Sequence, residues 1–374
     1  MKTQLIACLA VMAIVGLAQA ALPHSFQGLG DLTGQGLASE ARGTSADGTV
    51  IVGSSGTPDG QRAFIWTAAA GMVGLPTPTG LGMTWAQDVS PDGHFVVGFG
   101  GNSFGSPVGW EGIRWAVSGG TVRIPLAGSG VWAKGVSGDG SIVTGGTGGA
   151  VEQAFVWTAA GGLVGLAPPG PGTWRTNAEA VSADGRVVVG DYLNVTAGAR
   201  DAFRWTAETG MAGLGAFAAS AVSDDGSVVV GTLAGGPTFE AFRWTEAAGI
   251  VPLGTLGPDN ESRARGVSRD GSRVVGYITS TLDDSSQAFI WDAEHGMRLL
   301  KDVLVQDCGL DLTGWKLTQA WDVSNNGPTI VGRGYNPQGV EEAWQAVLPE
   351  PATLALLGLG ALAIFRRRTR PTPR

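Results

Sequence analysis

The sequence predicts an all-β protein, a seven-bladed β-propeller of four-stranded repeats closed by an N-terminal strand. Three observations predict this class. One motif recurs seven times, each copy holds segments that read as short strands, and the last copy lacks a fourth strand that the start of the chain supplies. Small sheets repeated at such a period are typical of stacked architectures, and four strands per unit are typical of a propeller blade.

The repeat begins with Ala-x-x-Val-Ser-x-Asp-Gly and continues with a valine-rich run, Ala-Phe-x-Trp and Gly-x-x-x-Leu. The third copy extends from Ala133 to Leu166. The turn glycine of the motif stands at Gly48, Gly93, Gly140, Gly185, Gly226, Gly271 and Gly327. The intervals are 45, 47, 45, 41, 45 and 56 residues, which is the range of a repeated small sheet.

Each part of the repeat predicts one strand. Asp-Gly between strand-forming segments indicates a tight hairpin, because glycine tolerates the positive φ of the turn. The valine runs, such as Val187–Val189, are continuously apolar, as expected for a strand buried on both faces. In Ala-Phe-x-Trp the Phe and Trp are two residues apart and share a face. Gly-x-x-x-Leu completes the unit as a short fourth strand.

The two ends of the repeat region predict how the ring closes. The seventh copy ends at Leu348 without a fourth strand, and Phe26–Leu32 resembles a fourth strand without the three before it. Together they would complete one blade and remove two exposed sheet edges. A parallel β-helix is the main alternative fold, but it would not predict the split unit.

Residues 1–20 are predicted to be a secretory signal peptide. Lys2 precedes an apolar run, and Ala18 and Ala20 are the small residues of a cleavage site. Cys8 lies too early for the lipidated cysteine of a lipoprotein. Without the signal peptide, Cys308 is the only cysteine, so we expect no internal disulfide. The propeller is expected to occupy residues 21–348.

Residues 349–374 are predicted to form a second targeting segment. Pro349, Glu350 and Pro351 precede an apolar run over 352–365, which is followed by Arg366, Arg367 and Arg368. The arginines predict a cytoplasmic end. Fourteen residues reach only about 21 Å, less than the roughly 30 Å hydrocarbon core of a membrane. We therefore expect a short transmembrane sorting helix that is removed; an ordinary tail anchor is the alternative.

This end resembles the PEP-CTERM sorting signal of Gram-negative bacteria, in the order and spacing of its three parts. The resemblance implies processing by an exosortase, transient insertion in the inner membrane, and then a cell-surface or secreted protein. The repeats resemble two groups. The Ser-x-Asp-Gly hairpin is similar to periplasmic propellers of the translocation type, and Ala-Phe-x-Trp is similar to the extracellular HAF repeat over residues 26–347. Gly112 and Ile113 replace the Ala-Phe pair in the second copy, and we assign Glu342 to the Phe position of a shifted seventh copy.

The charge of the body excludes some partners. The chain has 24 Lys and Arg against 32 Asp and Glu. Six of the basic residues and none of the acidic ones lie in 1–20 and 352–374. The body of the chain, residues 21–351, therefore has a net charge of 18 − 32 = −14. A body this acidic is unsuited to nucleic acid or to anionic membranes. It suits an extracellular protein kept soluble by self-repulsion.

The chemistry-bearing residues favour a protein that is not an enzyme. The aspartates of the repeat recur in nearly every copy, as turn residues do and catalytic residues do not. Three histidines, none spaced with another ligand, predict no metal site, and no motif predicts a cofactor. Residues 297–319 lengthen the last interval. They include a possible helical turn at 299–304, which we interpret as a cap on one end of the ring, with a functional insertion as the alternative.

Four tryptophans outside the strand position form the candidate ligand platform. Trp85, Trp132, Trp174 and Trp315 each stand shortly before an Ala-x-x-Val-Ser strand and are expected in or near loops at one end of the ring. Aromatic faces suit stacking on sugar rings; plugging the gaps between blades is the alternative. We therefore expect a non-enzymatic cell-surface or matrix protein that binds exopolysaccharide. The alternative is a secreted propeller enzyme acting on polysaccharide.

Overall fold

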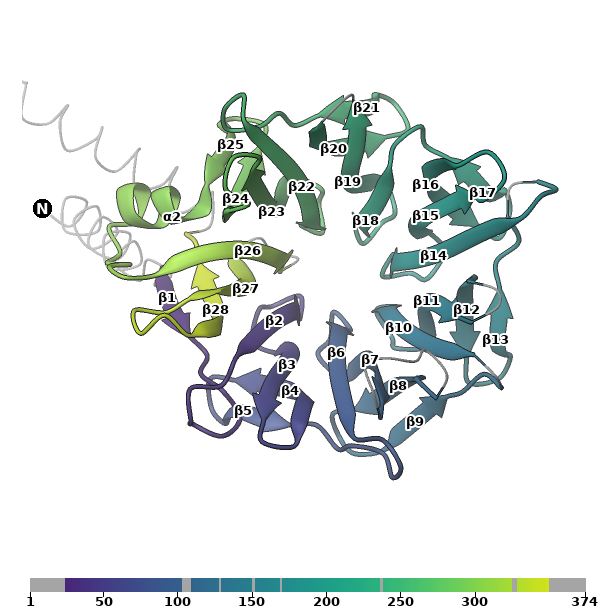
Figure 1. Cartoon of the computed structure of the whole chain (residues 1–374), viewed down its shortest axis with the longest axis horizontal. Helices are drawn as coiled ribbons and strands as arrows, with labels where there is room; N and C mark the ends of the chain where they lie inside the picture. The colour runs from purple at the N-terminus through teal and green to yellow at the C-terminus, as the bar shows by residue number, and fades with distance from the viewer. Residues whose placement is uncertain are drawn as a thin grey trace, which may run out of the picture.

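A computed structural model of the chain describes residues 24–102, 109–127, 129–149, 152–168, 170–235, 238–324 and 328–349. Within these ranges the strands form seven four-stranded antiparallel sheets arranged as a ring (Figure 1). The predicted seven-bladed propeller is therefore confirmed. The predicted signal peptide and the predicted sorting helix lie outside the described residues.

Six of the sheets are built from consecutive strands. Blade 1 contains β2 (Ser39–Thr44), β3 (Ile51–Thr57), β4 (Gly60–Thr67) and β5 (Gly71–Gly74). Blade 2 contains β6 (Met83–Val89), β7 (Phe95–Gly101), β8 (Glu111–Ala116) and β9 (Thr121–Ile124). Blade 3 contains β10 (Gly130–Val136), β11 (Ile142–Gly148), β12 (Ala154–Thr158) and β13 (Gly162–Gly165). Blade 4 contains β14 (Trp174–Val181), β15 (Val188–Asn194), β16 (Ala199–Thr206) and β17 (Gly210–Gly213). Blade 5 contains β18 (Ala218–Val222), β19 (Val228–Gly235), β20 (Thr238–Thr245) and β21 (Gly249–Pro252). Blade 6 contains β22 (Asn260–Val267), β23 (Arg273–Ser280), β24 (Ser286–Asp292) and β25 (Gly296–Leu299).

Blade 7 joins the two ends of the chain, as the split repeat predicts. It contains β26 (Lys316–Val323), β27 (Thr329–Tyr335) and β28 (Glu341–Val347), and its fourth strand is β1 (Ser25–Gly28). β1 pairs antiparallel with β28 from Ser25 opposite Val347 to Gly28 opposite Trp344. The strand that follows the predicted signal peptide therefore closes the ring (Figure 1).

The pairing of β27 with β28 corrects the alignment of the seventh repeat. Gly332 pairs with Trp344, just as Gly53 pairs with Phe64 in blade 1. Trp344 therefore occupies the Phe position, where it is fully buried, and Glu342 does not replace Phe. The assignment of Glu342 was wrong because it placed Trp344 at the Trp position of Ala-Phe-x-Trp. The register of the strand pair places the Trp344 ring at the Phe position, between the blades.

The hydrophobic core consists of layers between neighbouring blades. One layer contains Val52 and Ala63 of blade 1 together with Val96 and Ile113 of blade 2, all four without exposed surface. Since each valine-rich strand packs on a neighbour at both faces, its continuous apolar run is explained.

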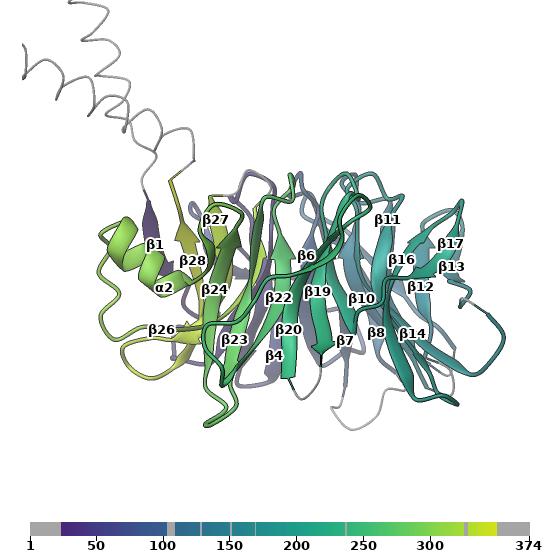
Figure 2. The ribbon, with the colours of Figure 1, turned by 90° about the horizontal axis from the view of Figure 1, so that it is seen from above.

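The insertion between blades 6 and 7 forms α2 (Leu300–Asp302) and a π-helical turn, η1 (Val303–Asp307). Leu300 and Leu304 are fully buried and join the core layer of these two blades. The predicted helical turn is thus present. It lies on the outer flank of the ring in both views rather than over one end (Figures 1 and 2).

The Ser-x-Asp-Gly segments form the tight turns that the sequence predicts. In the first, the Asp47 carboxylate accepts hydrogen bonds from the Ser45 hydroxyl and the Thr49 N–H at 2.6 and 3.0 Å. Partial burial raises the pKa of Asp47, but these bonds outweigh it and lower the pKa below its ordinary value. Six turn glycines, including Gly48, have φ between 67° and 73°. The recurrent aspartates are therefore structural turn residues.

Candidate functional site

The turns define one face of the ring, which we call the turn face. The opposite face, the cleft face, is made by the loops that join the second and third strands of each blade and by the segments that connect blades. Val347, at the end of β28, pairs with Thr329, and the Leu348 N–H donates to the Pro328 carbonyl at 2.7 Å beside the seventh turn. Ser25 pairs with Val347 as well, so both described ends of the chain reach the turn face (Figure 2).

The central channel is lined by the residues that follow the repeat alanine. Six of the seven line its cavity: Arg42, Lys134, Glu179, Ser220, Arg265 and Trp321. The seventh is Gln87 of blade 2. The Trp321 ring lies between two guanidinium groups, with the Arg42 carbon 3.9 Å and the Arg265 carbon 5.1 Å from ring centroids. The cavity within the channel holds only about 160 Å³. It is smaller than the roughly 300 Å³ at which small-molecule pockets begin, so the channel is not the site for a sugar chain.

Two aspartates in the channel link neighbouring blades. Asp88 and Asp322 stand at the inner-strand position where the other repeats have Gly or Ala. The Asp322 carboxylate accepts hydrogen bonds from the N–H groups of Thr44 in blade 1 and of Val323, at 2.9 and 2.7 Å. Asp88 accepts equivalent bonds from Val136 in blade 3, at 2.9 Å, and from Val89, at 2.8 Å.

Enclosure between blades alters the protonation of both groups. Burial raises the pKa of Asp322 to about 8, assisted by the charge of Asp88 and opposed by the two backbone bonds. Burial likewise raises the pKa of Asp88 to about 7. Both side chains are committed to backbone partners, so we interpret them as structural links between blades. These two aspartates were not identified from the sequence, because the position two residues after the repeat alanine is Gly or Ala in the other five copies. An alignment of the seven copies at this position would have identified them.

Serine and threonine hydroxyls form a second kind of link that the sequence comparison missed. The hydroxyl two residues before the repeat alanine accepts the N–H of the Ala-Phe-x-Trp strand in the preceding blade. Four such pairs occur among the described residues, at 2.8 to 3.0 Å: Ala63 with Thr84, Ala154 with Thr176, Ala241 with Ser262, and Ala343 with Ser39.

The four candidate tryptophans have different surroundings. Trp85 and Trp132 lie within the inner strands β6 and β10 rather than in loops, and Trp174 is the first residue of β14. Trp85 is stacked against Trp110 and Phe99, with ring centroids 5.2 and 5.6 Å away. It therefore packs within blade 2, although its side chain is only half-buried.

The other three tryptophans line separate clefts on the cleft face. Trp315 contacts Phe26 of the closing strand edge-on, with centroids 5.0 Å apart, and its outer edge lines a cleft between blades 6 and 7. Trp174 packs against Tyr192 at 5.3 Å and lines a cleft between blades 4 and 5. Trp132 lines a cleft between blades 3 and 4.

We call this last cavity the blade 3/4 cleft; it holds about 700 Å³ and is the largest of the three. Its lining includes Phe99, Trp132, Lys134, Glu152, Arg175, Asp191 and Arg200. Arg200 donates two bonds to the Asp191 carboxylate, at 2.9 and 2.8 Å. Burial raises the pKa of Asp191, and the charge of Arg200 opposes that effect. Arg175 is the least restrained cation, 57% exposed and 3.7 Å from Glu152.

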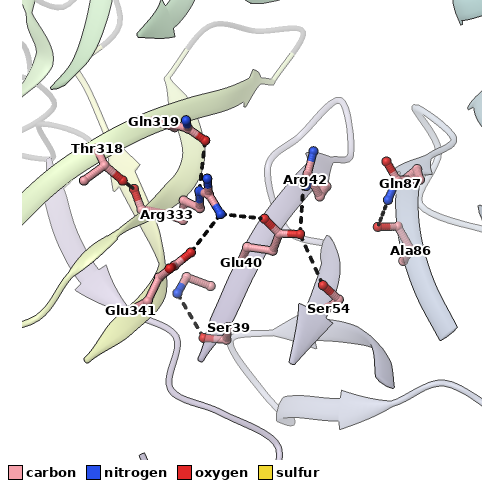
Figure 3. A network of polar contacts seen from close by, with 11 residues as sticks. Ser39, Glu40, Arg42, Ser54, Ala86, Gln87, Thr318, Gln319, Arg333 and Glu341 are labelled. Carbon is pink, nitrogen blue, oxygen red and sulfur yellow. Dashed lines mark hydrogen bonds and ion pairs between the residues drawn. The ribbon is translucent and has the colours of Figure 1, made fainter. Parts of the chain in front are cut away.

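A similar cavity of about 600 Å³, the blade 6/7 cleft, lies across the ring. Its lining includes Asp284, Lys301, Trp315, Lys316, Arg333, Tyr335 and Glu341. Figure 3 shows how Arg333 is held: Nη1 lies 2.9 Å from Glu341 and 3.5 Å from Glu40, and Nε donates to Gln319. Within the described ranges, no three His, Cys, Asp or Glu side chains are grouped to hold a metal. No helix in those ranges has the length and apolarity needed to cross a membrane.

These features define a β-propeller with ligand-sized clefts on one face. Comparison with solved structures agrees on the fold. Oligogalacturonate lyase from Vibrio parahaemolyticus is 10% identical, with 88% of this chain and 98% of that chain covered and a TM-score of 0.56. The β-propeller domain of the Trilobed protease from Pyrococcus furiosus is 12% identical, with 83% and 95% covered and a TM-score of 0.54. At such identities the likeness shows the fold alone.

The C-terminal end carries a recognisable sorting motif. The profile of the PEP-CTERM protein-sorting motif matches residues 347–370. The chain is thus an exported propeller whose C-terminal motif implies recognition by an exosortase and a C-terminal anchor in a Gram-negative bacterium. No curated protein matches the sequence significantly. The matched residues begin beside Leu348, which lies at the turn face, and the clefts lie on the opposite face.

Proposed function

We propose that this protein is a surface-attached or released binding module that holds extracellular polysaccharide in the blade 3/4 cleft. The observation that supports the proposal best is the position of Trp132, half-buried in a cavity that also contains exposed charged side chains. An aromatic face beside hydrogen-bonding groups suits a sugar ring, which has an apolar face and polar edges. The orientation away from the sorting motif leaves the cleft open to material outside the cell.

We also propose how the protein is processed, to which repeat group it belongs and how it acts. The signal peptide would be removed after Ala20, and the inner-membrane stage would be transient. The repeats would belong with the extracellular HAF group. The protein would act without catalysis, as a component of the cell surface or of the exopolysaccharide matrix.

Substitution of Trp132 tests the binding site. Trp132→Ala should lower the affinity for the host's purified exopolysaccharide about fivefold or more, because stacking on an aromatic ring contributes on the order of 1 kcal/mol or more. The melting temperature should change little, since the Trp132 ring is not stacked and its contact with Trp110 is tilted, with centroids 6.3 Å apart. Titration calorimetry and a thermal melt on the same preparation measure both quantities.

Trp85→Ala is the matched control, because Trp85 occupies the same repeat position one blade earlier. Its ring is stacked on both Trp110 and Phe99, so truncation should cost about 3 kcal/mol of stability while binding by the folded fraction persists. Unchanged binding by Trp132→Ala, or an early melt of that variant, would contradict the proposed site.

A secreted enzyme acting on polysaccharide is the second candidate, supported by one observation. Asp191 is a carboxyl group with a raised pKa in the same cleft, the property expected of a proton donor. Its tight pairing with Arg200 favours a structural role. Incubation with the host polysaccharide and measurement of new chain ends discriminates the two: turnover that is abolished in Asp191→Asn would establish the enzyme.

A further inference from the structure

We propose that the blade 6/7 cleft is a second binding site and that both clefts take an anionic polysaccharide, one chain of which is held at two places on the ring. This inference rests on the proposed function and specifies its ligand. It starts from the composition of the two clefts, which is alike although they share no residue.

The charges of the clefts differ from those of the rest of the protein. Each cleft is lined by three basic and two acidic side chains: Lys134, Arg175 and Arg200 with Glu152 and Asp191, and Lys301, Lys316 and Arg333 with Asp284 and Glu341. Residues 21–351 carry a net charge of 18 − 32 = −14. Six turn aspartates, all with lowered pKa, lie on the opposite face. Basic side chains are therefore concentrated where a ligand would enter.

One cation in each cleft is available to a ligand. Arg200 is committed to Asp191, and Arg333 to Glu341 and Gln319. Arg175 has only a long contact with Glu152, and Lys316 is exposed with no hydrogen-bond or ion-pair partner among the described residues. Each of these two cations lies at the start of an inner strand, β14 or β26. A carboxylate or sulfate on a sugar would pair with them.

Each cleft also offers an aromatic surface beside its available cation. Trp132 provides it in the blade 3/4 cleft, and Tyr335, 42% exposed and paired with Lys316 between β26 and β27, provides it in the blade 6/7 cleft. An aromatic ring and a cation together match a charged sugar, which presents an apolar ring face and an anionic substituent. A neutral glycan would stack on the aromatic ring but would form no ion pair with the cation.

The positions of the clefts suit one polymer. Blades 3 and 4 lie across the ring from blades 6 and 7 (Figure 1). Both clefts are lined by residues from loops of the cleft face. A chain held in one cleft is kept near the other, so the second contact is intramolecular and raises the overall affinity.

The test uses the intact folded protein with four probes: polygalacturonate, dextran sulfate, neutral dextran and a short oligogalacturonate. Titration calorimetry should give two short oligomers per ring, tight binding of both polyanions that weakens with salt, and negligible binding of dextran. Lys316→Ala and Arg175→Ala should each leave one oligomer per ring and weaken polymer binding about 100-fold through lost avidity. Arg186→Ala is the matched control, because Arg186 is an exposed cation on the turn face, and it should bind as the unmodified protein does.

The outcomes separate this inference from the proposed function. If Arg175→Ala abolishes binding while Lys316→Ala behaves like Arg186→Ala, the second site is wrong and the first stands. Dextran binding equal to that of the polyanions would overturn the anionic ligand. Binding of polygalacturonate without dextran sulfate would restrict the ligand to carboxylated sugars. If no probe and no host polysaccharide binds, both proposals fail.

Discussion

The Asp322 carboxylate accepts a hydrogen bond from the backbone N–H of Thr44 at 2.9 Å, and so joins the last blade to the first. Asp88 makes the same contact with Val136, between blades 2 and 3. At both places a carboxyl group stands where other repeats have no polar side chain. The closure of the ring therefore has a polar link in the channel as well as the β1–β28 pairing at its outer edge.

These links predict a pH-dependent stability. Burial raises the pKa of Asp88 to about 7 and of Asp322 to about 8, above the ordinary carboxyl value. Between the unfolded and the folded pKa the folded protein binds more protons, so its stability falls as pH rises from about 5 through about 8. Thermal melts across this range should show a falling melting temperature. The Asp88→Asn, Asp322→Asn double variant resembles the protonated form and should show a much flatter dependence. An equally steep slope in that variant would place its origin elsewhere.

Removal of the closing strand should destabilise the whole ring. Deleting residues 25–32 exposes the edge of β28 and removes Phe26 from its contacts with Trp315 and Trp344. Loss of a packed Phe alone costs about 3–5 kcal/mol, which for a ring of this size corresponds to a fall of about 5 °C or more in melting temperature. A chain that begins at Ser25 is the control and should melt normally. Equal melting temperatures for the two chains would argue against closure by β1.

Much of the fold followed from the sequence because repetition makes each weak signal count seven times. The turn glycine, the valine run and the Phe-x-Trp pair each predict a strand or turn poorly alone, but at a fixed period they predict a blade. The split blade was predictable for the same reason. The last copy ends at Leu348 without a fourth strand, and the segment that begins at Phe26 resembles a fourth strand without the other three. The Trp344 register was missed because two aromatic positions compete in one short strand.

The candidate site was less predictable, because contacts between distant residues determine it. Trp85 and Trp132 occupy the same repeat position, yet Trp85 is stacked against Phe99 and Trp110. Trp132 has only a tilted contact with Trp110, at 6.3 Å, and lines an open cleft. Only the second blade has this Trp110, which lies outside the repeat motif. The role of Arg175 depends likewise on how β14 meets the neighbouring blade, which no local pattern encodes.

The turn glycines predict a difference between two otherwise matched substitutions. Gly140 and Gly162 both have φ of +67°, so Ala at either site costs about 1–2 kcal/mol for the left-handed conformation. A methyl group at Gly140 would collide with the Phe95 ring of the preceding blade, whereas at Gly162 it meets open space. Gly140→Ala should therefore be less stable than Gly162→Ala by about 1–3 kcal/mol. Chemical denaturation measures the difference; equal losses would mean that Phe95 moves aside without cost.

The last prediction concerns the C-terminal end, where the sorting motif matches residues 347–370. We expect the mature protein to end close to Pro351, because the apolar run over 352–365 is about 21 Å long as a helix and too short for a stable anchor. The propeller should not depend on this tail, since Leu348 is the last described residue that joins the core layer of blades 6 and 7. Intact mass of protein released from the native cell surface measures the end directly. Replacing Pro349, Glu350 and Pro351 by alanine should block removal while leaving the melting temperature unchanged. Surface protein that retains Arg366 to Arg374 would contradict processing and favour an ordinary tail anchor.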